Sequence, residues 1–521
     1  MAGGLGSERR GLRVRTGSAV VVLGLIAVSV TSSPALASTA RPGSETSGIA
    51  WGSCDPPGAA LQCARVAVPL DWDHPNGKQI ELSVIRHLAS QPNKRIGSLF
   101  MDPGGPGLSG VEFVRDNGPD LDEVGGGRFD VVSWDPRGTN RSSPVQCFTS
   151  DQAAQQFWAG VSIPTTRDES QAYQRKTVEL AQRCGQVSGD LLAHISTADT
   201  ARDLDELRRL VGDDKLTYVG LSYGTMIGQI YVNLFPDRVR AMVLDGLVDA
   251  VEYTTSAETR VANQSSAFDA VLAKFVELCQ NAGPGRCALA GHGNESVAQR
   301  VAQVFAKARE TPIPAPRSVP PGALDYSDLL VASFNPLRLP GTWPKFAEDL
   351  DAAADGNATE LENAARAART AAAFADATTS AAVSCADAAA RQPSQAWPSV
   401  IPKLTDVSKV YGPVLGWWLW APCASNWPAR GTDQYAGPWD AKTRTPILLL
   451  NNRWDPATSL QNSQVAEQRL GNAVLLTENG YGHLTLNTPS ECVDRVRTRY
   501  LVYRIVPRRG TECPVDHVPF S

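Results

Sequence analysis

Short apolar runs alternate with amphipathic stretches along most of this chain. Runs rich in Val, Ile, Leu and Phe predict β-strands at residues 79–87, 96–102, 129–135, 215–221, 240–246, 445–452 and 472–478. Between the third and fourth runs, residues 196–212 carry Leu204, Leu207, Leu210 and Val211 at helical spacing. Strands that alternate with helices predict an α/β fold, in which helices cover both faces of a mostly parallel sheet.

This alternation stops after Asp249 and returns near Thr445. The residues between, 251–434, are rich in Ala, interrupted by Pro and helical in their apolar spacing. We therefore predict a large helical cap inserted into the sheet domain. Residues 51–250 form the first part of that domain, and residues 435–521 form its C-terminal part.

The first 37 residues have the pattern of a secretory signal peptide. Basic residues precede an apolar run at 19–30, and small residues lead to a cleavage position after Ala37. The apolar run is short for a membrane span, so we expect no stable membrane insertion once the signal is removed. Arg9 and Arg10 leave open whether export uses a twin-arginine route. Residues 38–50 are small and polar and predict a flexible mature N-terminus.

Composition and cysteine content fit an exported globular protein. The chain is 42% hydrophobic and 20% charged, and its net charge of −5 argues against nucleic-acid binding. Ten cysteines, an even number, predict disulfides. Sequence does not determine the connectivity, and the simplest hypothesis joins sequence neighbours: Cys54–Cys63, Cys147–Cys184, Cys279–Cys287, Cys385–Cys423 and Cys492–Cys513. No C-x-x-C pair occurs, and we predict no metal site.

A serine flanked by glycines stands between a predicted strand and a predicted helix. The segment Gly220-Leu221-Ser222-Tyr223-Gly224 fits G-x-S-x-G, the nucleophile elbow, in which a tight turn raises the Ser hydroxyl above the sheet edge. Its neighbours must be small because the turn is tight. A chance match in a loop is the alternative. The strand before it and the helix after it favour a catalytic nucleophile.

A serine nucleophile needs a base and an acid, which follow it in the order Asp/Glu and then His in such sheets. Of the six histidines, only His483 comes after the Ser and just beyond the last strand; the others are His74, His87, His194, His292 and His517. Asp455 follows the preceding strand and stands before Pro456, where it also suits a turn. We predict Ser222, Asp455 and His483 as the catalytic residues.

The oxyanion hole is expected at an early turn after a strand. Gly104, Gly105 and Gly107 follow the strand at 96–102, and backbone N–H groups can approach a substrate oxygen where no side chain intrudes. Residues 105–110 also satisfy G-x-G-x-x-G, a weak sign of dinucleotide binding. Dinucleotide-dependent enzymes are not expected among exported, disulfide-bonded proteins, so we predict no cofactor.

Taken together, these segments resemble a known family. "DPGGPGLSG", "FDVVSWDPRGTNRSSPVQC", "TADTARDLDELRRLVG", "YVGLSYGTMIG", "NNRWDPATS" and "GYGH" are similar to the secreted tripeptidyl aminopeptidases of actinomycetes, which are relatives of proline iminopeptidase. The resemblance extends from about Trp51 to Cys513. It implies an α/β-hydrolase fold, the triad named above, and oxyanion N–H groups from Gly105 and Tyr223. Leu108, Asn140 and Arg141 depart from the family pattern, which bears on substrate preference.

The expected function follows from these residues and the resemblance. We predict a secreted serine exopeptidase that removes short peptides, such as tripeptides, from substrates with a free amino terminus. A secreted carboxylesterase or lipase with the same triad is the alternative, and a non-catalytic binder is a third. Acids in the cap are the expected partners of the substrate amine; they include Glu258, Asp269, Glu277, Asp325, Asp328 and Asp387.

Overall fold

The computed structural model describes residues 48–58, 60–388, 394–424 and 426–521, and a nine-stranded sheet forms its centre. The strand order is β1-β2-β4-β3-β5-β6-β9-β10-β11. β2 is antiparallel to both β1 and β4, and every other neighbouring pair is parallel. The strands are β1 (Leu61–Pro69), β2 (Gln79–His87), β3 (Gly97–Asp102), β4 (Phe129–Trp134), β5 (Leu216–Leu221), β6 (Val239–Asp245), β9 (Ile447–Trp454), β10 (Ala473–Tyr481) and β11 (Thr511–Cys513).

All seven strands predicted from apolar runs are present, with ends that differ by a few residues. β1 and β11, at the two edges of the sheet, were not predicted. The central strands β3, β4 and β5 are buried at every position. Burial on both faces explains their continuous apolar sequences and confirms the predicted α/β-hydrolase fold.

Helices cover both faces of the sheet. α1 (Gly110–Val124) and α16 (Glu491–Tyr503) share one buried cluster with Leu99, Met101 and Val131. On the other face, α4 (Thr197–Leu210), α5 (Gly224–Leu234) and α15 (Leu460–Arg469) share a cluster with Phe100 and Val132. Successive strand residues thus enter opposite cores, as the period of two requires.

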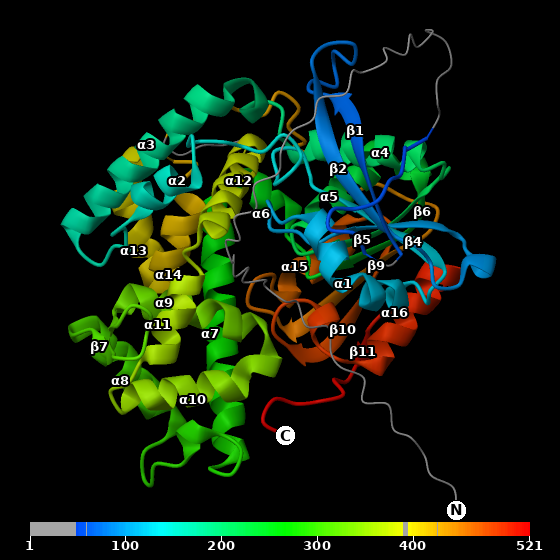
Figure 1. The fold of residues 1–521 in the computed structure, drawn as a ribbon. Helices are drawn as coiled ribbons and strands as arrows, with labels where there is room; N and C mark the ends of the chain where they lie inside the picture. The colour runs from blue at the N-terminus through cyan, green and yellow to red at the C-terminus, as the bar shows by residue number, and fades with distance from the viewer. Residues whose placement is uncertain (1–47, 59, 389–393, 425) are drawn as a thin grey trace, which may run out of the picture.

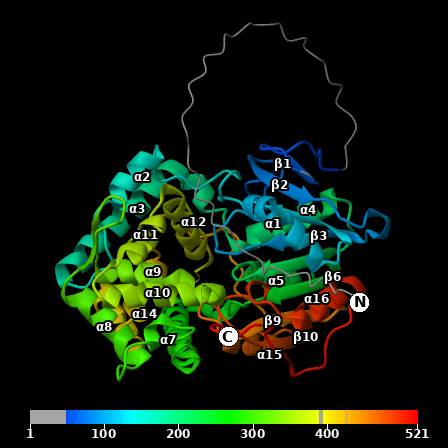
Figure 2. The ribbon, with the colours of Figure 1, turned by 60° about the horizontal axis from the view of Figure 1, so that its bottom comes forward.

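A second group of helices lies to one side of the sheet, as Figures 1 and 2 both show. Most of it falls between β6 and β9, where the helical cap was expected. The helices are α6 (Ala250–Thr255), α7 (Ala257–Ala282), α8 (Val297–Glu310), α9 (Tyr326–Arg338), α10 (Trp343–Ala354), α11 (Thr359–Ala367), α12 (Ala371–Asp387), α13 (Trp397–Val407) and α14 (Tyr411–Leu415). A hairpin of β7 (Ile313–Ala315) and β8 (Gly322–Leu324) joins them.

The long helix α7 organises this group, because it contacts α8, α9, α13 and α14. A separate apolar core forms around Phe268, Phe275 and Trp343. Two helices from before β5, α2 (Asp151–Trp158) and α3 (Arg167–Leu192), pack against α12. The cap therefore includes chain segments from both sides of the elbow. Its predicted boundaries at residues 251 and 434 stay a prediction.

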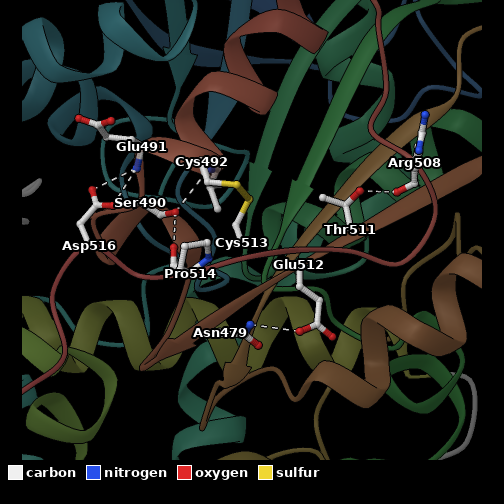
Figure 3. The surroundings of a disulfide bond; sticks show 11 residues. Asn479, Ser490, Glu491, Cys492, Arg508, Thr511, Glu512, Cys513, Pro514 and Asp516 are labelled. Carbon is white, nitrogen blue, oxygen red and sulfur yellow. Dashed lines mark hydrogen bonds between the residues drawn. A yellow bond between two sulfur atoms is a disulfide. The ribbon is translucent and has the colours of Figure 1, made fainter.

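Five disulfides join the described cysteines, in the pairing predicted from sequence neighbours. Cys492–Cys513 ties α16 to the edge strand β11, as Figure 3 shows. Beside it, the Ser490 hydroxyl donates to the Pro514 carbonyl over 2.7 Å, and Asn479 donates to Glu512 over 3.1 Å. These contacts fix the short last strand to its neighbours.

The predicted signal peptide, residues 1–37, lies outside the described residues, as does most of the predicted flexible segment 38–50. Within the part of the chain that the structure describes, no helix has the length and apolar character needed to cross a membrane.

Candidate active site

Ser222 occupies a sharp turn between β5 and α5. Its φ of 54° lies in the left-handed region, which L-residues rarely adopt. Its backbone N–H donates to the Asp245 carbonyl at the end of β6 over 2.9 Å, and its carbonyl accepts from Thr225 N over the same distance. A strained serine at the carboxyl end of a central strand is the geometry of a nucleophile elbow.

The glycines that flank the elbow are required by close packing. A Cβ on Gly220 would lie 2.4 Å from the Gly224 carbonyl oxygen, and a Cβ on Gly224 would lie 2.7 Å from the Asp102 carbonyl oxygen. Neither distance is compatible with a side chain. The small residues in the G-x-S-x-G pattern thus have a steric cause in this chain.

The predicted acid and base are hydrogen-bonded to each other. His483 Nδ1 lies 2.9 Å from Asp455 Oδ2, and both residues are 2% exposed. Asp455 follows β9, and its carboxylate also accepts from the backbone N–H groups of Ala457 and Thr458, each over 2.8 Å. His483 Nε2 is buried and has no hydrogen-bond partner among the described residues, so it is available to a reacting group.

The imidazole of His483 lies against the end of β6, the strand whose last residue accepts a hydrogen bond from Ser222 N. A Cβ on Gly246 would be 3.4 Å from His483 Cε1, and Gly246 directly follows the Asp245 carbonyl that binds Ser222 N. The segment that carries His483, here called the histidine loop, is anchored to β9. Asn452 Nδ2 donates to the carbonyls of Gly482 and Leu484, each over 3.1 Å. The structure thus brings Ser222, Asp455 and His483 to one edge of the sheet.

The predicted oxyanion turn packs directly on the elbow. A Cβ on Gly104 would lie 2.9 Å from Tyr223 N and 3.0 Å from Ser222 Cβ. Gly105 has a φ of 109°, which favours glycine. Asp102 beneath the turn accepts from Gly104 N over 2.9 Å, and burial raises its pKa to about 7. The N–H groups of Gly105 and Tyr223 belong to segments that meet beside Ser222.

A cavity of about 580 Å³ lies between the elbow and the cap. Ser222, Gly105 and Tyr223 line it from the sheet domain, and Phe334 and Trp418 line it from the cap. Its volume falls in the range of pockets for small molecules or short peptides. A largely apolar wall with a few polar groups is typical of a substrate site.

Comparison with known proteins identifies the family. Residues 408–513 match the family model described as "TAP-like protein". The chain is 31% identical to serine protease Hip1 of Mycobacterium tuberculosis over 493 residues, which cover 88% of each chain. The protein belongs to this family of serine α/β-hydrolases.

Other members of the family carry different activities in their names. Tripeptidyl aminopeptidase of Streptomyces lividans is 29% identical and aligns over 87% of this chain and 84% of its own. Carboxylesterase B of Mycobacterium tuberculosis is 30% identical, over 87% and 86%. Membership therefore shows that the protein is a serine hydrolase. It does not show whether the substrate bond is an amide or an ester, because that depends on the side chains of the cavity.

The acids that line the cavity differ from those proposed above. None of Glu258, Asp269, Glu277, Asp325, Asp328 and Asp387 is among the lining residues. The lining acids are Asp249 and Glu252, at the start of α6. The sequence offered one signal for them, an acid-containing helix start directly after a strand, "DGLVDAVE".

These two acids differ in their freedom to bind a ligand. Asp249 caps α6 through the N–H groups of Val251 and Glu252 and forms an ion pair with Arg469. Glu252 accepts from Asn263 Nδ2 over 2.7 Å, and no cation within the described ranges forms an ion pair with it. Burial raises the pKa of Glu252. Glu252 is therefore the acid best placed to receive a cation in the cavity.

Proposed function

We propose that this protein is a secreted serine exopeptidase that releases short peptides, tripeptides foremost, from substrates with a free amino terminus. The observation that carries the proposal is a cavity lined by both the elbow serine and an acid. Ser222 lines it at the sheet edge that also carries the Asp455–His483 pair, and the half-buried Glu252 lines it from α6. The name of the Streptomyces relative supports the same substrate class.

In the proposed mechanism, Ser222 Oγ attacks the substrate carbonyl while His483 Nε2 accepts the hydroxyl proton. Asp455 orients the imidazole through Nδ1 and stabilises its charged form. The N–H groups of Gly105 and Tyr223 bind the oxyanion, each contributing roughly 3 kcal/mol to barrier lowering. His483 then protonates the leaving amine, and water, activated by the same histidine, releases the acyl group from Ser222.

Glu252 supplies the selectivity for a free amine in this proposal. An ammonium group that enters the cavity loses hydration and needs an anion nearby, because an unpaired buried charge is costly. Glu252 carries that charge. Asn263, which donates to its carboxylate, keeps it in place.

We also propose that the protein is exported. The signal-like sequence at residues 1–37 and the five disulfides support this, because disulfides persist mainly in oxidising compartments. A secreted carboxylesterase is the second candidate. It is favoured by the relative of that name and by the largely apolar cavity wall.

Paired chromogenic tripeptides test the proposal, one with a free amine and one acetylated. Acetylation is expected to lower kcat/KM at least roughly tenfold, or about 1.4 kcal/mol of transition-state stabilisation. Glu252→Gln should remove most of that difference, while Asn462→Ala, a change at another lining position, should retain it. Equal rates on both peptides, or faster hydrolysis of simple acyl esters, would move the assignment to the esterase.

A further inference from the structure

Three arginines line the cavity, and they differ in what their guanidinium groups contact. Arg369 forms an ion pair with Asp328. Arg260 lies over the Tyr253 ring, 4.5 Å from its centroid. Arg338 forms no side-chain hydrogen bond and no ion pair with any residue that the structure describes. Arg260 likewise forms no ion pair within the described residues, and its Nε is buried without a hydrogen-bond partner. Of these two guanidinium groups that lack an anion, Arg338 is the one whose backbone contacts the catalytic histidine.

Arg338 stands at the end of α9 whose face lines the cavity. Val331, Phe334, Asn335 and Arg338 all line it, at the i, i+3, i+4 and i+7 spacing of one helix face. Its own backbone is tied to the catalytic histidine, since the Arg338 carbonyl accepts from His483 N over 2.8 Å. Arg338 thus lines the part of the cavity next to the imidazole.

The surroundings of Arg338 make an anion the fitting partner. Burial lowers its pKa, and the charge of Asp455 acts in the opposite direction. Asp455 itself is occupied, because its carboxylate already accepts from His483, Thr458 and the loop backbone. Arg338 is half-buried in the cavity wall. A bound substrate that displaces its remaining water makes an unpaired guanidinium costly, and the planar set of donors matches a carboxylate.

The leaving group of the proposed reaction must lie on this side. His483 protonates the leaving amine, so the segment released first lies next to the histidine loop that Arg338 holds. We propose that Arg338 binds the free carboxylate of that leaving segment. The preferred substrates are then short peptides with both termini free. Glu252 binds the amino terminus and Arg338 binds the carboxyl terminus. This inference rests on the proposed peptidase function.

A tetrapeptide of one sequence, prepared as the free acid and as the carboxyl-terminal amide, tests the inference with the mature protein. The wild type should cleave the acid at least about tenfold faster in kcat/KM than the amide, as expected for a charge-assisted hydrogen bond. Arg338→Gln should lose this preference, so that the ratio of kcat/KM for acid and amide falls to about one. Arg338→Lys should keep part of the preference, because the charge stays and the paired donors are lost. Arg369→Gln is the matched control and should preserve the wild-type ratio, since Arg369 already has Asp328.

Equal rates on acid and amide, or a preference that survives Arg338→Gln, would overturn the inference. An equal fall on both peptides in Arg338→Gln would also overturn it and would point to a general role of this side chain in shaping the cavity wall, since the backbone carbonyl that binds His483 N is unchanged. The proposed function has its own readout in the acetylated peptides. A wild type that discriminates against acetylation and ignores the carboxylate retains the exopeptidase assignment and loses only the role of Arg338.

Discussion

At the scale of single residues, Ser222 combines backbone strain with tight support. Its left-handed φ of 54° persists because Asp245 binds its N–H and Thr225 binds its carbonyl, while Gly220 and Gly224 leave room for the turn. Such strain is retained where the surrounding structure determines it. The result is a serine that lines the cavity between the end of β5 and the start of α5.

Ser222→Ala should therefore fold as the wild type does and lose nearly all turnover. Losing a triad nucleophile typically lowers kcat roughly a million-fold. Peptide hydrolysis and labelling by a fluorophosphonate probe measure the loss. Ser459→Ala, which removes another hydroxyl from the cavity wall, should keep both. Substantial turnover by Ser222→Ala, with unchanged labelling, would contradict the elbow assignment.

The residues of the site divide by how they could be predicted. Ser222, Asp455 and His483 have a motif or a fixed chain order, and each lies within two residues of the end of a strand, so local sequence indicated them. Glu252 and Arg338 carry no motif. Their positions depend on how the cap packs on the sheet domain, and an acid or an arginine on a helix more often faces solvent. The six candidate cap acids illustrate this, because sequence does not distinguish them and none of them lines the cavity.

At the scale of elements, a buried polar junction joins the cap to the elbow. Asp387 ends α12 and accepts from Thr197 N over 2.7 Å, at the first turn of α4. The Thr197 hydroxyl also contacts the Tyr223 hydroxyl beside the nucleophile. The carboxylate thus acts on the positive end of α4 and connects three elements that are distant in sequence.

Asp387→Ala should destabilise the fold and lower kcat. It leaves the Thr197 N–H buried without an acceptor and removes one of the two partners of the Thr197 hydroxyl, which keeps Tyr223. An unsatisfied buried donor typically costs about 1–3 kcal/mol. Urea unfolding measures the free energy, and steady-state kinetics measures kcat. Asp387→Asn retains an acceptor oxygen and should lose less stability. Loss of stability without any change in kcat would show that the junction holds the cap alone and does not support the elbow.

The buried Glu478 on β10 predicts a pH dependence of stability. Burial raises its pKa from 4.5 to about 9, so the folded protein keeps this proton where the unfolded chain releases it. The folded state therefore binds more protons between these values, and stability falls as pH rises from about 4.5 towards 9. Glu478→Gln removes this dependence. The variant should gain Tm over the wild type at pH 8 and gain little at pH 5, and an equal gain at both values would exclude Glu478 as the cause.

Element prediction succeeded where burial makes a pattern. The central strands are buried on both faces and read as apolar runs. β1 was not predicted, because most of its residues are only partly buried at the sheet edge and Gln62 and Arg65 interrupt its apolar run. β11 spans three residues, too few for any periodicity. Their places in the sheet come from partners far away in the sequence.

At the scale of the whole molecule, the cavity exists only because two units meet. Its catalytic edge comes from the sheet domain, and most of its wall comes from the helices beside it. The helical insertion was predictable from composition. The contribution of α2 and α3 was not, since long-range packing alone brings them to α12. Family membership indicates a serine hydrolase, and the wall that would contact a substrate combines side chains from both units.

The disulfide Cys385–Cys423 joins two parts of that wall. Cys385 lies in α12, which contributes Ala377, Ser380 and Ser384 to the cavity, and Cys423 follows the segment that contributes Trp418 and Leu419. Its partners are 38 residues apart, so replacing both by Ser should lower the free energy of unfolding by about 2–4 kcal/mol. Without the disulfide, α12 and the segment with Trp418 and Leu419 are no longer linked, so the cavity should bind peptides less well. KM should rise more for a tripeptide than for a small acetyl ester, because the ester contacts only the residues around Ser222.

The pair Cys54–Cys63 provides the matched control for this prediction. It closes a separation of nine residues beside β1 and contributes nothing to the cavity wall among the described residues. Replacing both of these cysteines by Ser should lower Tm less, because a short loop restricts the unfolded chain less. It should also leave the ratio of peptide to ester kcat/KM unchanged. If the two double variants change that ratio equally, the cap disulfide does not shape the cavity, and the proposed peptide selectivity would reside in single side chains such as Glu252 and Arg338.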